Sequence, residues 1–200
     1  HMPEDAGPMI TKIVGFIESA SHRLLEQLQA MLELSRAQKN SEQSTEEIEL
    51  EYMVKEVWAA LSADVEDKGA VLNLKVEQAP RLYMEPENMR SVLQNLIGNA
   101  IKYSAPDRTP IVEVSSQRGA GQIIITISDN GLGMDLQKDR GKLFGMFNRF
   151  HSHVEGTGVG LYIVKQIVDN HHGAIEVESA PGVGTTCELS FPHQTTASKA

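Results

Sequence analysis

The chain has 200 residues, of which 18 are Lys or Arg and 27 are Asp or Glu, so its formal net charge is −9. This acidic balance excludes a general binder of nucleic acid or of anionic membranes, because both need a basic surface. A single cysteine excludes an intrachain disulfide framework and a cysteine-rich zinc site, and no apolar run is long enough to span a bilayer.

Residues 9–38 are predicted to form one long helix, because apolar residues recur there at alternating spacings of four and three. Further apolar residues, such as Phe16 and Leu25, widen this stripe beyond the seam of a two-stranded coiled coil. We interpret the helix as one member of a bundle, which packs against another helix or a second copy of itself. The alternative is that it packs on its own globular domain.

The segments that flank this helix carry no pattern of a packed element. Residues 39–46 are polar and are predicted to be a linker. The first residues, His1-Met2, are typical of a cloning remnant, so we expect the sequence to be a piece of a longer protein. Residues 1–8 and 194–200 are expected to be disordered.

Residues 47–193 are predicted to form one α+β domain, in which helices cover one face of a mixed sheet. The chain is expected to alternate between strands and helices, with one β-hairpin around Gly119-Ala120-Gly121. In chain order, we expect a strand at 48–50, a helix at 52–67, a strand at 71–76, a helix at 86–104, hairpin strands at 111–114 and 123–127, a helix at 158–171, and strands at 175–177 and 185–191.

The first candidate site motif lies on the helix 86–104. Asn95, Asn99 and Lys102 are spaced i, i+4 and i+7, which places two amides and one ammonium on one helix face. Amide oxygens are hard ligands that suit Mg²⁺, and a lysine neutralises phosphate charge. Taken alone, this face is also what a solvated helix surface looks like.

The second motif, Asp129-Asn130-Gly131-Leu132-Gly133, directly follows a predicted strand. Its glycines allow the backbone to approach a flat ligand closely, and the Asp129 carboxylate is an acceptor without donors. A carboxylate suits the exocyclic amine of adenine, whereas guanine presents a carbonyl at that edge. Taken alone, the motif is also an ordinary Asp-Asn-Gly turn.

The third motif comprises Gly156, Thr157, Gly158, Gly160 and Leu161, at the start of the helix 158–171. Glycines at a helix start leave backbone N–H groups pointing at an anion. The motif is not a P-loop, because no Lys-Ser/Thr follows the last glycine. It is not a dinucleotide fingerprint either, because no strand precedes it. A flexible glycine-rich loop is the alternative.

Together, the motifs resemble the GHKL ATP-binding superfamily, and specifically the catalytic ATP-binding domain of sensor histidine kinases. The resemblance covers about residues 47–192 and implies a two-layer α/β sandwich of the GHKL (Bergerat) type. Five segments match the N box, the first glycine box, the F box, the second glycine box and the terminal Gly-x-Gly-Thr-Thr segment in that order: 95–103, 129–133, 143–150, 156–161 and 182–187.

This resemblance implies ATP and Mg²⁺ as the bound groups. Asn99 would be the main Mg²⁺ ligand, with Asn95 assisting, and Lys102 and Arg149 would meet the phosphates. Tyr103 would pack beside the nucleotide, and Asp129 would bind the adenine amine with Thr186 near it. Phe147 would anchor a lid over about 145–157. The remaining implied contacts with ATP come from the two glycine boxes: Gly131, Gly133, Gly156, Thr157, Gly158, Gly160 and Leu161. His151 and His153 in the lid are interpreted as solvated residues, not as metal ligands.

The residue at position 95 separates kinases from hydrolases in this superfamily. Gyrase-, Hsp90- and MutL-like ATPases carry a Glu there, which activates water, and an amide cannot serve as a base. We therefore expect a phosphotransferase that gives the γ-phosphoryl group to a histidine. The alternatives are a nucleotide-responsive scaffold without kinase activity, and a GHKL-type Ser kinase.

The helix 9–38 resembles the second helix of a kinase dimerisation bundle. His22 lies on it, but the acid and the proline that usually follow an acceptor histidine are missing, so we expect no phosphoacceptor in this chain. The resemblance implies an upstream acceptor helix, a homodimer formed through that bundle, and a response-regulator receiver domain as partner. The expected location is cytoplasmic, within a longer protein that is itself soluble or membrane-anchored.

Overall fold

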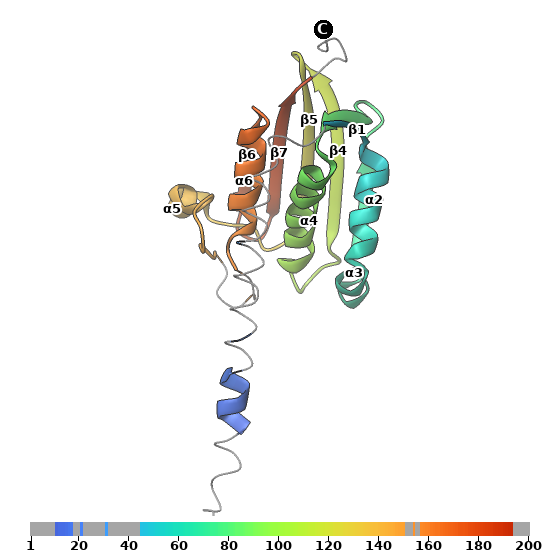
Figure 1. Cartoon of the computed structure of the whole chain (residues 1–200). Helices are drawn as coiled ribbons and strands as arrows, with labels where there is room; N and C mark the ends of the chain where they lie inside the picture. Colours follow the sequence, from blue (N-terminus) through green and yellow to red (C-terminus); the bar gives the residue numbers. More distant parts are fainter. Residues whose placement is uncertain are drawn as a thin grey trace, which may run out of the picture.

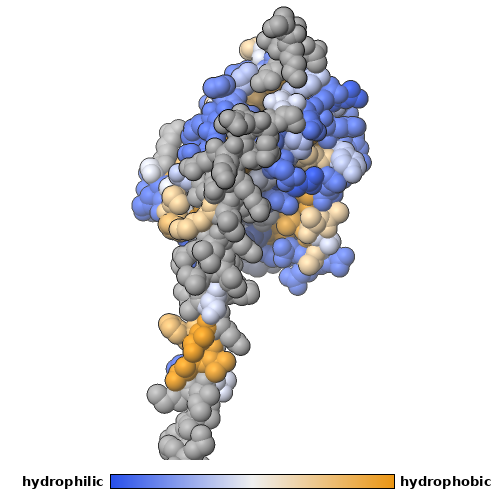
Figure 2. Space-filling view, viewed as in Figure 1, coloured by the Kyte–Doolittle hydropathy of each residue, from blue (hydrophilic) through white to orange (hydrophobic). Residues whose placement is uncertain are grey.

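A computed structural model describes residues 11–17, 21, 31, 45–150, 154 and 157–193, without the side chains of residues 139 and 140. Residues 11–17 are helical, and the apolar side chains of Ile13, Phe16 and Ile17 are 50%, 70% and 56% exposed. They form an apolar patch away from the folded domain (Figure 2). Nearly all of the remaining predicted helix, the linker up to residue 44, His22 and the two chain ends lie outside the described residues.

The domain is built on a five-stranded mixed sheet with the order β2-β4-β5-β7-β6 (Figure 1). The strands are β2 (Val71–Lys75), β4 (Ile111–Gly119), β5 (Gln122–Asp129), β6 (Ala174–Ala180) and β7 (Gly184–Pro192). Strands β2 and β4 are parallel, and all other neighbours are antiparallel. The predicted hairpin joins β4 to β5, and its central residues Ala120 and Gly121 have φ values of 49° and 76°. Positive φ at both positions gives the turn the twist that antiparallel strands need.

Three helices cover one face of this sheet, as predicted: α2 (Leu50–Ala60), α4 (Pro86–Lys102) and α6 (Gly160–Asn170) (Figure 1). Helix α4 lies between the other two and contacts both. It begins with Pro86 in its first turn and carries Lys102 in its last turn, both favourable positions. Its apolar residues at spacings of three and four face the core, which contains the fully buried Val54, Leu93, Ile97, Ile125, Ile167 and Leu189.

The single helix predicted at 52–67 is two helices, α2 and α3 (Ser62–Lys68). They meet at Leu61, whose N–H is shared between the carbonyls of Val57 and Trp58, each at 3.2 Å. The buried stripe of α2 ends before this point, and α3 has no buried side chain. Only the partly buried Val65 of α3 packs against the core, so little apolar contact keeps α3 in line with α2.

A strand that was not predicted, β3 (Arg81–Met84), pairs with β1 (Glu46–Glu49) in a separate two-stranded antiparallel sheet. Leu82 and Met84 are buried and alternate with more exposed residues, which is a strand pattern only four residues long. Two short segments, α5 (Leu136–Asp139) and the 3₁₀ turn η2 (Arg140–Lys142), follow β5. Among the described residues, no helix is both long enough and apolar enough to cross a membrane.

Candidate active site

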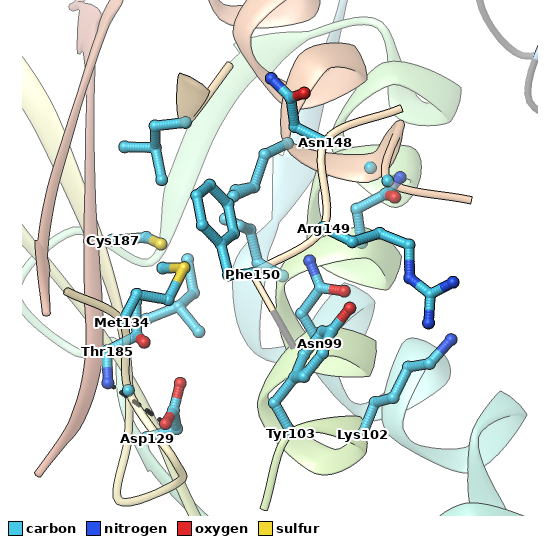
Figure 3. Close-up of a pocket in the computed structure, with 18 of the residues that line it drawn as sticks. Asn99, Lys102, Tyr103, Asp129, Met134, Asn148, Arg149, Phe150, Thr185 and Cys187 are labelled. Atoms are coloured by element: carbon cyan, nitrogen blue, oxygen red, sulfur yellow. Dashed lines mark hydrogen bonds between the residues drawn. The ribbon is translucent and has the colours of Figure 1, made fainter. Parts of the chain in front are cut away.

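A cavity of about 240 Å³ lies where the C-terminal half of α4, the end of β5, the start of β7 and the start of α6 meet (Figure 3). The segment 143–150, between η2 and α6, supplies a further wall. Most of the residues that the sequence singled out are brought together here, although they come from positions 95 to 161. The lining includes Asn95, Asn99, Lys102, Tyr103, Asp129, Gly133, Arg149, Thr157, Gly158, Gly160 and Leu161.

Asp129 occupies one end of the cavity as the last residue of β5. Its Oδ1 accepts hydrogen bonds from the backbone N–H groups of Gly131 at 2.8 Å and Thr185 at 3.2 Å. These bonds fix the carboxylate and leave the second oxygen facing the cavity (Figure 3). Burial raises the pKa of Asp129, and the two backbone hydrogen bonds offset part of this effect. The two backbone hydrogen bonds hold the carboxyl group in one orientation at this end of the cavity.

Glycines around Asp129 make this end of the cavity possible. A Cβ on Gly131 would lie 2.5 Å from the Tyr103 carbonyl oxygen, and a Cβ on Gly184 would lie 2.0 Å from the Asp129 carbonyl oxygen. Gly133 has a φ of +64°, and a Cβ there would lie 1.9 Å from the Ala180 carbonyl oxygen. The loop after β5 can therefore pack on α4 and on the β6–β7 turn only with glycine at these positions.

The two amides of α4 face the first residue of α6. The Asn95 Nδ2 donates to the Ser91 carbonyl oxygen at 2.9 Å, so its Oδ1 points the other way. A Cβ on Gly160 would lie 2.5 Å from this Oδ1 and 3.7 Å from Asn99 Nδ2. The helix start thus reaches the amides closely because it has no side chain there. This cradle combines amide oxygens with the backbone N–H groups of a helix N-terminus, a donor set that fits a magnesium-bound phosphate.

Two cations lie at the other end of the cavity. The Lys102 and Arg149 side chains point to the same side, away from Asp129, and Tyr103 lies between Asp129 and Lys102 (Figure 3). Arg149 Nη2 donates to the Val154 carbonyl oxygen. Burial raises the pKa of Tyr103, and the positive charge of Arg149 opposes this shift. The cavity is therefore polarised, with a carboxylate at one end and positive charge at the other.

The lid segment differs from the prediction in one residue. Phe147, predicted as its anchor, is 45% exposed with a φ of 63° and does not line the cavity, whereas the Phe150 side chain extends into it (Figure 3). The backbone of Phe147 and Asn148 packs on Gly158, where a Cβ would lie 2.5 Å from the Asn148 carbonyl oxygen. Gly156, His151 and His153 lie outside the described residues.

Strand β7 also presents a different threonine from the one predicted. Thr185 and Cys187 line the cavity, while the Thr186 hydroxyl lies 3.0 Å from that of Ser128. Successive residues of a strand point to opposite faces, so Thr186 lies on the face away from the cavity. Burial among apolar groups raises the pKa of the Cys187 thiol to about 12, so it is an unreactive wall residue. The other cavity residues that the sequence did not indicate are Leu96, Ile127, Met134, Leu143, Asn148 and Phe150.

Known proteins share both the sequence pattern and the fold. Phytochrome-like protein Cph1 of Synechocystis is 34% identical over 146 residues, which make up 72% of this chain and 19% of Cph1. Sensor-like histidine kinase SenX3 of Mycolicibacterium smegmatis is 30% identical over 178 residues, 86% of this chain and 45% of SenX3. The chain thus spans less than half of these relatives.

The solved structure of the Acinetobacter baumannii histidine kinase AdeS superposes with a TM-score of 0.69 at 21% identity, covering 98% of this chain and 88% of that one. At this identity, the likeness establishes the fold. Residues 84–195 match the family described as histidine kinase-, DNA gyrase B- and HSP90-like ATPases. The predicted superfamily and two-layer fold are therefore confirmed: this chain belongs to the family of histidine kinase-, DNA gyrase B- and HSP90-like ATPases.

Proposed function

We propose that this chain is the catalytic ATP-binding part of a sensor histidine kinase, and that it presents the γ-phosphoryl group of ATP to a histidine on a separate helix. Family membership supports ATP binding. Relatives whose names describe sensor histidine kinases, SenX3 among them, support the kinase branch of the family. The remaining support comes from the chemistry of the cavity.

The charge arrangement of the cavity fits a nucleotide that lies along it. Asp129 accepts the exocyclic amine of adenine through the oxygen that its backbone partners leave available. Tyr103 packs beside the nucleotide, and Lys102 and Arg149 at the other end neutralise the phosphates. The glycine at the start of α6 lets backbone N–H groups approach the same phosphates.

Asn99 and Asn95 are the residues that would hold Mg²⁺. Their amides face the cradle at Gly160, which a Cβ would fill, and amide oxygens are hard ligands of the kind that Mg²⁺ accepts. When bound, the ion neutralises phosphate charge. The chain's own contribution is to orient the nucleotide, to hold the phosphates between two cations, and to exclude solvent from the base.

The observation that carries the kinase assignment is the amide of Asn95, which has no base beside it among the residues that the structure describes. Among the described residues that line the cavity, Asp129 is the only carboxylate, and its backbone bonds hold it at the adenine end. An amide at position 95 cannot deprotonate water. The acceptor must therefore be a better nucleophile than water, and it must come from elsewhere. In this proposal it is a histidine of the dimerisation bundle, and a response-regulator receiver domain takes the phosphoryl group from it.

The proposal is tested in a full-length kinase that carries this chain, incubated with γ-labelled ATP. We expect a protein-bound label that is stable to alkali and labile to acid, as phosphohistidine is. Asn99→Ala should abolish the label. Gly98→Ala, at the neighbouring position of the same helix with open space around it, should keep it. Steady ATP hydrolysis without a phosphoprotein would contradict the kinase assignment.

A further inference from the structure

The C-terminal end of α4 is held by a lysine from another helix. Lys68, the last residue of α3, donates from Nζ to the carbonyl oxygens of Ile101 at 3.0 Å and Lys102 at 2.9 Å, and to the Ser104 Oγ at 3.2 Å. An ammonium has three N–H groups, so each of them has an acceptor here. The partners lie 33 to 36 residues away in the sequence. No sequence motif points to this contact.

The position of Lys68 matches an electrostatic need of α4. The last carbonyl groups of a helix have no partner inside the helix, and they form the negative end of its dipole. From beyond the helix, the Ile101 carbonyl oxygen otherwise accepts the N–H of the cap residue Tyr103, which also bonds Asn99, and the Ser104 N–H at a long 3.4 Å. A half-buried ammonium with two of these carbonyls therefore fixes the last turn more firmly than backbone hydrogen bonds do.

The turn that Lys68 holds carries cavity residues. Lys102 and Tyr103, which directly follow the Ile101 carbonyl, both line the nucleotide cavity. On its other side, the same turn binds the adenine loop, because the Tyr103 carbonyl oxygen accepts the Leu132 N–H at 2.9 Å. The neighbouring Gly131 donates to Asp129. A continuous set of contacts therefore leads from Lys68 through the end of α4 to Asp129.

We propose that Lys68 is a positioning residue for the nucleotide: it holds the last turn of α4 and thereby places Lys102, Tyr103 and the adenine loop around the base and phosphates. Lys68 does not line the cavity, so it acts through these residues. The contact is made of polar hydrogen bonds, and α3 reaches the hydrophobic core only through the partly buried Val65. This inference rests on the proposed function, because it assumes that the cavity binds ATP.

The test is a comparison of ATP and adenosine affinities in this chain, by competition with a fluorescent ATP analogue. Lys68→Met keeps the length of the side chain and removes all three donors. We expect both ligands to bind about tenfold more weakly, because without charge-assisted hydrogen bonds on its last turn α4 no longer holds Tyr103 and the adenine loop in place. Adenosine carries no phosphate, so its loss of affinity cannot arise from the missing positive charge. Lys68→Arg, which restores charged donors, should recover most of the affinity.

Lys55→Met is the matched control, because Lys55 is exposed on α2 and pairs only with Glu51 in the described structure. It should bind both ligands like the parent chain. Unchanged adenosine affinity in Lys68→Met would overturn the proposal. This holds if only the ATP affinity falls, which is an effect of charge, and also if only the melting temperature falls, which is an effect on stability. If Lys68→Met does not fold, Lys68→Gln carries the same expectation. A parent chain that fails to bind ATP would refute the proposed function instead.

Discussion

Replacing Asp129 by Asn tests the adenine end of the cavity with little change of shape. The Asn Oδ1 can still accept the backbone N–H groups of Gly131 and Thr185, which now lie 2.8 and 3.2 Å from the carboxylate. The cost to folding is therefore about 1 kcal/mol at most. The second oxygen, which faces the cavity, becomes an NH₂ group that meets the amine of adenine donor to donor.

The expected loss of ATP affinity follows from these contacts. A hydrogen bond to a charged group contributes about 1.5–3 kcal/mol, and a donor left unpaired adds a further cost of about 1 kcal/mol. The sum of about 2.5–4 kcal/mol corresponds to a Kd that rises roughly 70- to 900-fold. The same NH₂ group can donate to the carbonyl of guanine, so the GTP affinity should rise while the ATP affinity falls. The ratio of ATP to GTP affinity should therefore fall by a larger factor than the ATP affinity alone.

The assay is a calorimetric titration of the parent chain and the Asp129→Asn variant with Mg·ATP and Mg·GTP. Thermal melts of both proteins should agree within a few degrees, which shows that the fold is retained. An ATP affinity within about twofold of the parent chain would refute the placement of adenine at Asp129, since the loss worked out above is at least about 70-fold.

Three further outcomes are expected. Gly160→Ala places a Cβ 2.5 Å from Asn95 Oδ1, so Mg·ATP should bind at least about tenfold more weakly in titrations, and an unchanged affinity would show that the cradle holds no phosphate. Gly98→Ala, on the same helix with no atom near its Cβ, should raise the free energy of unfolding by about 0.5–1 kcal/mol in urea titrations. Burial raises the pKa of Glu85, so the protonated carboxyl contributes its full stability below the usual pKa of 4.5, and this contribution is lost as the pH rises through the raised pKa. Glu85→Gln should therefore flatten the decline of the melting temperature above pH 4.5. Parallel melting profiles of the two proteins would contradict the burial effect.

Local signals were sufficient for most of the fold and for the core of the candidate site. The spacing of apolar residues on α4 and the proline in its first turn predicted a helix within two residues of its observed ends. The positive φ values at Ala120 and Gly121 account for the predicted hairpin. Asn95 and Asn99 were singled out by their spacing with Lys102 on one helix face, and Asp129 by the glycines that follow it; all three line the same cavity.

The features that were not predicted depend on register or on distant contacts. The selection of Thr185 instead of Thr186 follows from the pairing of β7 with β5, and a shift of one residue exchanges the two faces of a strand. The lid contains two phenylalanines three residues apart, Phe147 and Phe150. The conformation of the lid backbone, which the sequence does not reveal, decides that Phe150 lines the cavity. The contact of Lys68 with α4 joins segments more than 30 residues apart. The implied roles of the site residues stay predictions that binding experiments decide.

The measurement that tests the central claim most directly is a calorimetric titration of this chain with ATP and with GTP, each in the presence and absence of Mg²⁺. A polarised cavity with a carboxylate at the base end and an amide pair at the phosphate end predicts binding of ATP that depends on Mg²⁺, and no binding of GTP. Binding of neither nucleotide, or equal binding of both, would contradict the assignment of this cavity as an ATP site.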